Sequence, residues 1–390
     1  MTAATSTIRF AKRPLFFAMH LLESVTTLAV VAIFLQAPMV FAQTEGEQTP
    51  LHGKELYQAA CSACHGPDGK GAPQAMVGFE IPLPDFTDCP FASREPDSDW
   101  IAITHSGGPA RGFSPIMPAF RDALDEKQIS SVVDHLHRFC RDQAWPRGDL
   151  NLPRPLVTEK AFPEDEAVLT TTIATEGSGA VTNDLLYERR FGARNQIEIK
   201  LPLPALEGPQ GGWHAGVGDI ALGLKRDLFH SMESGSIFSV GGEAVLPTGN
   251  RSTGLGKGYT VFEGYAAFGQ ILPSDAFVHL QAGIEAPKDS SRAAKESFWR
   301  AVVGKSWAQG NGLGRAWSPM LEMLGTRELQ SGEKSQWDLV PQIQISLSTR
   351  QHILFNVGVR LPVNNAGPRQ TQVMFYFLWD WFDGGLREGW

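Results

Sequence analysis

Apolar residues in the first third of the chain recur at helical spacing. The segment 125–140 carries apolar residues three or four positions apart, and Asp125 in front of them predicts an N-cap. These apolar residues are Ile129, Val132, Val133, Leu136 and Phe139. A second short helix is expected over 52–61, with Leu56 and Tyr57 on one face. The pattern predicts a small helical domain in which these two helices pack across each other.

Beyond residue 165 the apolar positions alternate with a period of two, which is typical of strands with one apolar and one polar face. Over 276–286, for example, Val278 and Leu280 alternate with His279 and Gln281. About twelve such runs of roughly ten residues match a transmembrane β-barrel, whose strands need about 9–11 residues. The expected strands are 167–176, 182–191, 195–204, 214–225, 235–247, 258–270, 275–286, 296–307, 316–326, 336–347, 350–361 and 370–382.

A soluble antiparallel sandwich or soluble barrel would also alternate. Strands longer than the common length of about 5–6 residues favour the membrane barrel, and so do Gln, Glu, Asn and Arg on the polar faces, which suit a hydrated lumen. Lys305 is an exception on the expected lipid face, near a strand end where it can reach water. The expected lumen residues include Glu263, His279, Glu285 and Glu322. Aromatic residues expected at the membrane interfaces are Trp299, Trp307, Trp379 and Trp381.

Composition supports a turn-rich, exported protein. The 390 residues include 40 Gly and 26 Pro, and the net charge of -8 does not indicate a nucleic-acid partner. Lys12 and Arg13, an apolar stretch over 25–35 and the sequence Val40-Phe41-Ala42 predict a cleaved signal peptide. An uncleaved anchor is the alternative, but the stretch is short for a span of about 20 residues.

The same patterns divide the chain into four parts. They are a signal peptide over 1–42, a helical domain over 43–144, a proline-rich linker over 145–165 and a β domain over 166–390.

The stretch QAACSACHGPDGKGAP contains the chemistry most easily recognised in the sequence. Cys61, Cys64 and His65 form a C-x-x-C-H motif, the attachment sequence for a c-type haem. Two cysteines three apart can each bond one vinyl group of the porphyrin, and the adjacent His65 then lies under the iron. A thioredoxin-like motif would follow a strand of a βαβ unit, and a zinc site would need a second Cys/His pair. The sequence has neither, so it predicts covalent haem.

A sixth iron ligand is expected downstream on a loop. Met117 lies in GFSPIMPAF, before the last helix of this domain, and a thioether there would raise the reduction potential. His105 is the rival, and an imidazole would lower the potential. His135 and His137 on the last helix are expected to be solvated or packed.

KELYQAACSACHGPDGKG followed by IMPAF and an amphipathic helix resembles class I monohaem cytochromes c. The resemblance implies a helical fold, one haem c ligated by His65 and Met117, and one-electron transfer at an exposed haem edge. The chain departs from many members in having Cys89 and Cys140. In an oxidising compartment these two favour a disulfide, and two separate buried thiols are the alternative.

The β half resembles outer-membrane barrels, particularly channels associated with phenol-degradation pathways. GVGDIALGLKRDLF resembles their glycine-spaced strand, and the chain ends on the aromatic Trp390, although its last strand is expected to stop near Trp381. The whole chain is similar to the fused cytochrome–porins of bacteria that oxidise extracellular iron, which usually carry a shorter haem segment.

These features together predict a carrier that passes single electrons at or across the outer membrane, with the haem domain in the periplasm or the barrel lumen. The expected partners are a redox protein or an extracellular or periplasmic electron donor, together with haem-maturation and barrel-assembly machinery. A passive solute channel whose cytochrome serves a neighbouring enzyme is one alternative, and a soluble cytochrome with a β docking domain is another. Catalysis is not expected, because a Met-ligated iron has no open position and the β domain shows no catalytic constellation.

Overall fold

The protein is described here by a computed structural model that covers residues 50–78, 83–209, 211–309, 314–348, 350–367 and 369–380. The chain divides into two compact units, Met1–Thr49 and Pro50–Trp390, and the described residues all belong to the second. The predicted signal peptide, Trp381 and Trp390 lie outside the described residues. No helix in the described ranges is long and apolar enough to cross a membrane.

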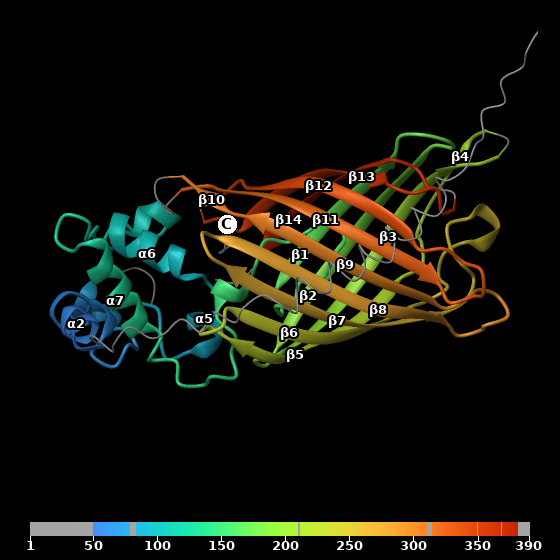
Figure 1. The fold of residues 1–390 in the computed structure, drawn as a ribbon. Helices are drawn as coiled ribbons and strands as arrows, with labels where there is room; N and C mark the ends of the chain where they lie inside the picture. Colours follow the sequence, from blue (N-terminus) through green and yellow to red (C-terminus); the bar gives the residue numbers. More distant parts are fainter. Residues whose placement is uncertain are drawn as a thin grey trace, which may run out of the picture. The chain divides into compact units, whose positions relative to one another are not determined.

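The helical domain contains short helices joined by glycine-rich turns (Figure 1). They are α2 (Pro50–Leu56), the π-helical turn η1 (Tyr57–Cys61), α3 (Ser62–His65), α4 (Gln74–Val77), α5 (Cys89–Ala92), α6 (Asp97–Ser106), the 3-10 turn η2 (Gly108–Arg111) and α7 (Glu126–Leu136). The predicted N-cap of α7 is confirmed: Asp125 and Gln128 form a reciprocal capping box, which satisfies two backbone donors at the helix start.

Helices α2 and α7 pack closely across each other, as the apolar pattern predicts. Ile129, Val132 and Val133 of α7 are buried, and Tyr57 lies against this face with no exposed surface. Gly53 makes the close approach possible, because a Cβ at this position would lie 2.0 Å from the carbonyl oxygen of Ser131.

Replacing Gly53 by Ala is therefore expected to destabilise the helical domain by about 1–3 kcal/mol, the usual cost of overpacking. The backbone of α7 would have to move, since the clash involves a carbonyl and not the end of a flexible side chain. Guanidinium unfolding of the haem-loaded full chain, followed by haem absorbance, measures this loss. Ser130→Ala on the exposed face of α7 is the control. Equal midpoints for the two variants would contradict the expectation.

The β domain is a closed antiparallel barrel of the predicted twelve strands (Figure 1). The strands are β1 (Glu166–Ala174), β2 (Ala180–Phe191), β3 (Asn195–Glu207), β5 (Ala221–Ser231), β6 (Ser236–Val245), β7 (Val261–Leu272), β8 (Ala276–Pro287), β9 (Glu296–Lys305), β11 (Ala316–Glu328), β12 (Gln336–Ser346), β13 (Ile353–Pro362) and β14 (Gln372–Asp380). Neighbours along the chain pair with each other, and β14 pairs with β1 to close the barrel. The short strands β4 (Trp213–Ala215) and β10 (Trp307–Ala308) extend β3 and β11 at the rim.

One expected strand, 214–225, is wrong as a continuous element. The chain forms β4 and then β5, separated by residues 216–220. Pro202 and Pro204 on β3 explain the break. Their carbonyls accept from Gly218 and Gly216, so their backbone nitrogens face the same neighbour, and proline has no N–H to continue the ladder.

The outer surface of the barrel is apolar, and its interior carries many polar and charged side chains together with a few apolar clusters. On β5, Leu224 is 59% exposed, whereas its neighbour Lys225 is 2% exposed and points inward. The predicted face assignment of β8 holds as well, since His279 and Gln281 are buried and Ile284 is exposed. Because a protein in water buries its apolar face, this inverted arrangement is typical of a barrel surrounded by lipid.

The connections at the two ends of the barrel differ in length. The end at which β1 begins and β14 finishes carries the three shortest connections, 192–194, 232–235 and 273–275, together with 306–315 and 347–352. The opposite end carries the longer loops 208–220, 246–260 and 288–295, of which the first includes β4. Outer-membrane barrels have short periplasmic turns and longer extracellular loops. The chain passes from the helical domain into the barrel at the end that carries the three shortest turns.

Candidate functional site

The C-x-x-C-H motif lies at the junction of η1 and α3. Cys61 ends η1, and Cys64 and His65 are in the single turn of α3. Both cysteines are free thiols of intermediate exposure. The loop that follows folds back onto the motif, with the N–H groups of Gly71 and Ala72 donating to the carbonyls of His65 and Cys64 at 2.9 and 2.7 Å. The motif therefore has a fixed backbone.

Tyr57 and Phe86 hold the histidine in place. The Tyr57 hydroxyl, fully buried, donates to the carbonyl of Gly66 at 2.7 Å. The ring of Phe86 lies 5.1 Å from that of His65, centre to centre. Burial lowers the pKa of His65 below that of a free imidazole, which favours the neutral form of the ring. A neutral imidazole is the form that can bind a metal.

These residues fit a covalently bound haem. Two free thiols stand three positions apart next to His65, and Nδ1 of His65 is buried with no hydrogen-bond partner among the described residues. Beside them lies an apolar cluster whose buried members are Tyr57, Phe86 and Val132. The donor set and this apolar wall suit the attachment and burial of a macrocycle.

Met117 lies in a tight loop after η2. The N–H of Gly108 donates to the Met117 carbonyl at 3.1 Å, and the N–H of Met117 donates to Ser114 at 3.2 Å. The loop is closely packed, because a Cβ on Gly108 would lie 2.1 Å from the carbonyl oxygen of Ser114. The role of Met117 as sixth ligand stays a prediction.

The other histidines of this domain have neighbours of their own. His137 places Nε2 2.6 Å from Oδ1 of Asp97, and His135 packs against Tyr57 and Phe139 with ring centres 5.3 and 5.2 Å away. Nδ1 of His105, the rival ligand, lies 2.8 Å from the Ser106 hydroxyl.

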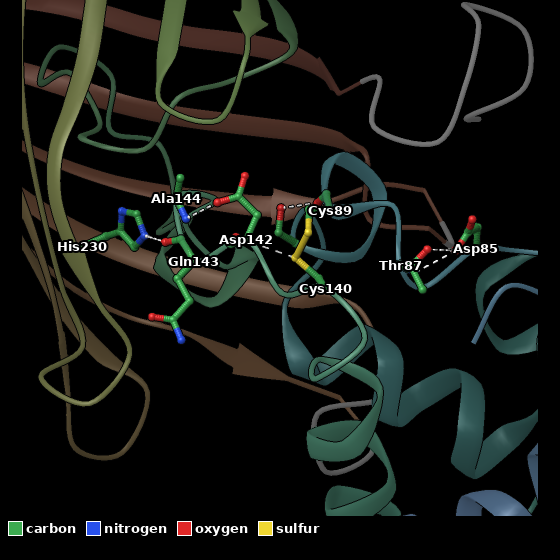
Figure 2. The surroundings of a disulfide bond; sticks show 9 residues. Asp85, Thr87, Cys89, Cys140, Asp142, Gln143, Ala144 and His230 are labelled. Carbon is green, nitrogen blue, oxygen red and sulfur yellow. Dashed lines mark hydrogen bonds between the residues drawn. A yellow bond between two sulfur atoms is a disulfide. The ribbon is translucent and has the colours of Figure 1, made fainter. Parts of the chain in front are cut away.

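Cys89 and Cys140 are joined by a disulfide (Figure 2). The bond connects α5 to the segment after α7, 51 residues away in sequence. Three residues beyond Cys140, the carbonyl of Gln143 accepts a hydrogen bond from Nε2 of His230 on β5 at 2.9 Å (Figure 2). The disulfide thus fixes the point at which the chain leaves the helical domain for the barrel.

Of the proline-rich segment 145–165, expected as a linker, residues 150–165 lie inside the barrel, whereas Arg147 and Asp149 bond Asp97 of the helical domain. Side chains of the lumen wall form hydrogen bonds with the backbone of this segment. Gln342 accepts from the N–H of Leu156 at 2.9 Å, and Glu322 accepts from the N–H of Thr158 at 2.6 Å. Side chains on eleven of the twelve strands make such hydrogen bonds or ion pairs with the segment. They are Glu166, Glu188, Gln196, Lys225, Ser239, His279, Gln281, Arg300, Glu322, Gln342, Asn356 and Tyr376.

Two cations of this segment are buried among the acidic residues of the wall. Arg154 pairs with Glu166 of β1 and with Glu188 of β2, and its side chain is 7% exposed. Lys160 pairs with Glu164 and lies 3.6 Å from Glu166. Buried charges are stable only when they are paired, so these contacts fix the segment in one position.

Apolar residues of the segment fill pockets in the wall. Leu150, Ala161 and Phe162 belong to a cluster that includes Tyr265 and Ala267. These two residues lie on β7, the one barrel strand that does not appear in the list above. Leu152 and Leu156 each join a separate cluster of inward-facing strand residues. We call residues 150–165 the plug. It combines polar, charged and apolar contacts around the whole circumference of the lumen.

The plug separates two cavities. One, of about 770 Å³, lies toward the helical domain and is lined by Glu95, Asp149 and Glu166 among others. The other, of about 370 Å³, begins at Arg154 and extends past Thr170 and Thr172 of β1 toward the long loops. Of the expected lumen residues, Glu263 lines the second cavity, and His279 and Glu322 bond the plug.

The plug was not foreseen because its apolar residues follow no helical or strand period. The available signal was its composition: Arg154 and Lys160 lie close to Glu159, Glu164 and Asp165, and three leucines stand among its prolines. Such a mixture is unusual for a solvated linker.

Comparisons with known proteins agree with this two-part organisation. Residues 48–136 match the family described as Cytochrome C oxidase, cbb3-type, subunit III. The chain therefore joins a cytochrome c domain, which implies haem c, to a twelve-stranded barrel. None of the curated proteins compared matches the chain.

Three solved barrels are distantly similar to the β domain. An outer membrane channel from Pseudomonas putida F1 is 15% identical, with 59% of this chain and 100% of that chain covered and a TM-score of 0.44. The NanC porin is 8% identical, with 55% of this chain and 98% of that chain covered and a TM-score of 0.39. The KdgM porin is 10% identical, with 55% of this chain and 99% of that chain covered and a TM-score of 0.37. The strand pairing of this chain, and not these distant likenesses, establishes the barrel.

Proposed function

We propose that this protein is an electron-transfer domain carried by an outer-membrane barrel, and that the barrel serves as an anchor and not as an open channel. The apolar outer surface of the barrel supports its place in a lipid bilayer. The short turns on the side of the helical domain support a periplasmic position for that domain.

In this proposal one haem is held covalently by Cys61 and Cys64, with His65 and Met117 as axial ligands. When bound, the group supplies reversible one-electron chemistry. The surrounding residues favour the neutral form of His65, and the Tyr57 hydroxyl anchors the backbone next to it. The donor or acceptor would be a redox protein or a reductant that reaches the periplasmic side.

The plug is the observation that favours an anchor over a passive solute channel. A channel needs an unobstructed lumen, whereas here residues 150–165 contact all twelve strands. The contacts include the buried pair of Arg154 and Glu188, which a passing solute would have to break. Leaving one of these charges buried without its partner would cost about 3–5 kcal/mol, so displacement of Arg154 alone is unfavourable.

Conductance in planar lipid bilayers tests this proposal. The wild-type chain is expected to insert without a steady open current, because the plug closes the lumen. A variant in which residues 150–163 are replaced by a Gly/Ser segment of equal length should conduct, since Gly/Ser chains make none of these contacts. The matched control replaces the loop 329–335 at the opposite end by Gly/Ser and should stay closed.

Two further results would overturn the proposal. A steady open current from the wild-type chain would support the channel hypothesis. Recovery of the haem protein only in the soluble periplasmic fraction, without heat-modifiable migration in gels, would mean that the β domain is a docking module and not a membrane anchor.

A further inference from the structure

Arg350, between β12 and β13, binds the helical domain next to the loop that contains Met117. Arg350 donates from Nε to the carbonyl of Arg111 at 3.1 Å and from Nη2 to the carbonyl of Gly112 at 3.2 Å. Its guanidinium carbon lies 4.4 Å from the centre of the Phe113 ring. One side chain of the barrel therefore contacts three consecutive residues of the cytochrome domain.

These three residues belong to a closed loop that ends at Met117. The N–H of Phe113 donates to the carbonyl of Gly108 at 2.9 Å, and the N–H of Gly108 donates to the carbonyl of Met117 at 3.1 Å. A Cβ on Gly108 would lie 3.2 Å from the Cβ of Met117, so the two sides of the loop are in close contact. A shift at Arg111–Phe113 would be transmitted to Met117 through this packing.

Two further contacts hold this loop and the neighbouring helix α6 in place. Arg111 donates from Nε to Asp99 of α6 at 2.8 Å. His352, in the same barrel turn as Arg350, places Nε2 3.0 Å from Oε1 of Glu95, which precedes α6. The barrel turn thus holds both the loop and the helix to which the loop is bonded.

We propose that Arg350 is a positioning residue for the sixth iron ligand, so that the barrel stabilises the axial ligation of the haem in the cytochrome domain. The inference rests on the proposed role of Met117. The N–H groups of a guanidinium are fixed in one plane whose face can stack on a ring, so this side chain is preorganised to serve two carbonyls and the Phe113 ring, which the point charge of an ammonium is not. Hydrogen bonds from a charged donor are stronger than those between neutral groups, so two of them from one side chain favour a single conformation of the loop.

The test uses the full chain with covalently attached haem, in detergent. Two properties of the ferric protein are measured: the weak far-red absorption band that sulfur ligation of iron produces, and the affinity for added imidazole, which competes with Met117. Arg350→Gln is expected to weaken the band and to raise the imidazole affinity by about tenfold or more. Arg350→Lys, which keeps the charge and one hydrogen bond, should give an intermediate result.

Arg292→Gln is the matched control, because this arginine is partly exposed and pairs with Asp289 in the β8–β9 loop at the other end of the barrel. It should leave both properties unchanged. Heat-modifiable migration identifies folded barrels in every sample, and Arg350→Lys remains informative if Arg350→Gln does not fold.

Met117→Ala separates the two proposals. If it leaves the far-red band unchanged, Met117 is not the ligand, and both its proposed role and the inference fail. If it abolishes the band while both Arg350 variants bind imidazole as the wild type does, Met117 ligation stands and the positioning role of Arg350 is overturned.

Discussion

Replacing Arg154 by Ala is expected to destabilise the barrel by about 3–5 kcal/mol, the usual cost of removing one partner of a buried ion pair. Arg154 lies in the plug and neutralises Glu166 and Glu188, whose side chains are 1% and 0% exposed. Without the guanidinium, two carboxylates remain close together in the lumen with less compensation. Urea unfolding of the barrel in lipid vesicles, followed by tryptophan fluorescence and heat-modifiable migration, measures the loss.

Arg189→Ala is the matched control for this prediction. Arg189 pairs with Asp165 at 3.2 Å, but its side chain is 52% exposed, so its removal should cost about 0–1 kcal/mol. Adding Glu188→Gln to the Arg154→Ala background should restore part of the stability, because one unpaired charge is removed. Equal losses for Arg154→Ala and Arg189→Ala would show that the plug does not depend on this ion pair.

Replacing Cys89 and Cys140 together by Ser is expected to lower the free energy of unfolding of the helical domain by about 2–4 kcal/mol. The disulfide closes a long loop, since its cysteines are 51 residues apart, and so restricts the unfolded chain. The measurement is guanidinium unfolding of the full chain, followed by haem absorbance.

Treatment of the wild type with a reductant provides the matching comparison, because thioether links to haem survive it while a disulfide does not. Reduced wild type and the double variant should unfold at the same denaturant concentration, below that of the oxidised wild type. Coinciding midpoints for oxidised wild type and the double variant would mean that the bond does not stabilise this domain.

Local patterns in the sequence determined most of the fold. The period-two alternation after residue 165 predicted twelve strands, and the inward position of His279 and Gln281 follows from that period alone. The capping box at Asp125 depends on residues three apart, so it too was visible in the sequence. The break between β4 and β5 was missed, because it depends on prolines of the neighbouring strand.

The candidate haem site was predictable for the same reason. Cys61, Cys64 and His65 are contiguous, and the chemistry of attachment requires that spacing. Their surroundings were not predictable in the same way, since Phe86 reaches His65 from outside the motif. The partner of the loop before Met117 is more remote still: Arg350 lies 239 positions beyond Arg111.

Only the tertiary structure decided what residues 150–165 do. The sequence shows prolines without a period, and such a segment can be a solvated linker or a packed strand of irregular backbone. Its backbone hydrogen bonds end on strand side chains that are 32 to 222 residues away, from Gln196 to Tyr376. A closed barrel brings these side chains together in one interior, and no local sequence pattern predicts that they surround the segment. The sequence by itself thus determined the elements and the haem motif, and the closure of the barrel determined that its lumen is filled.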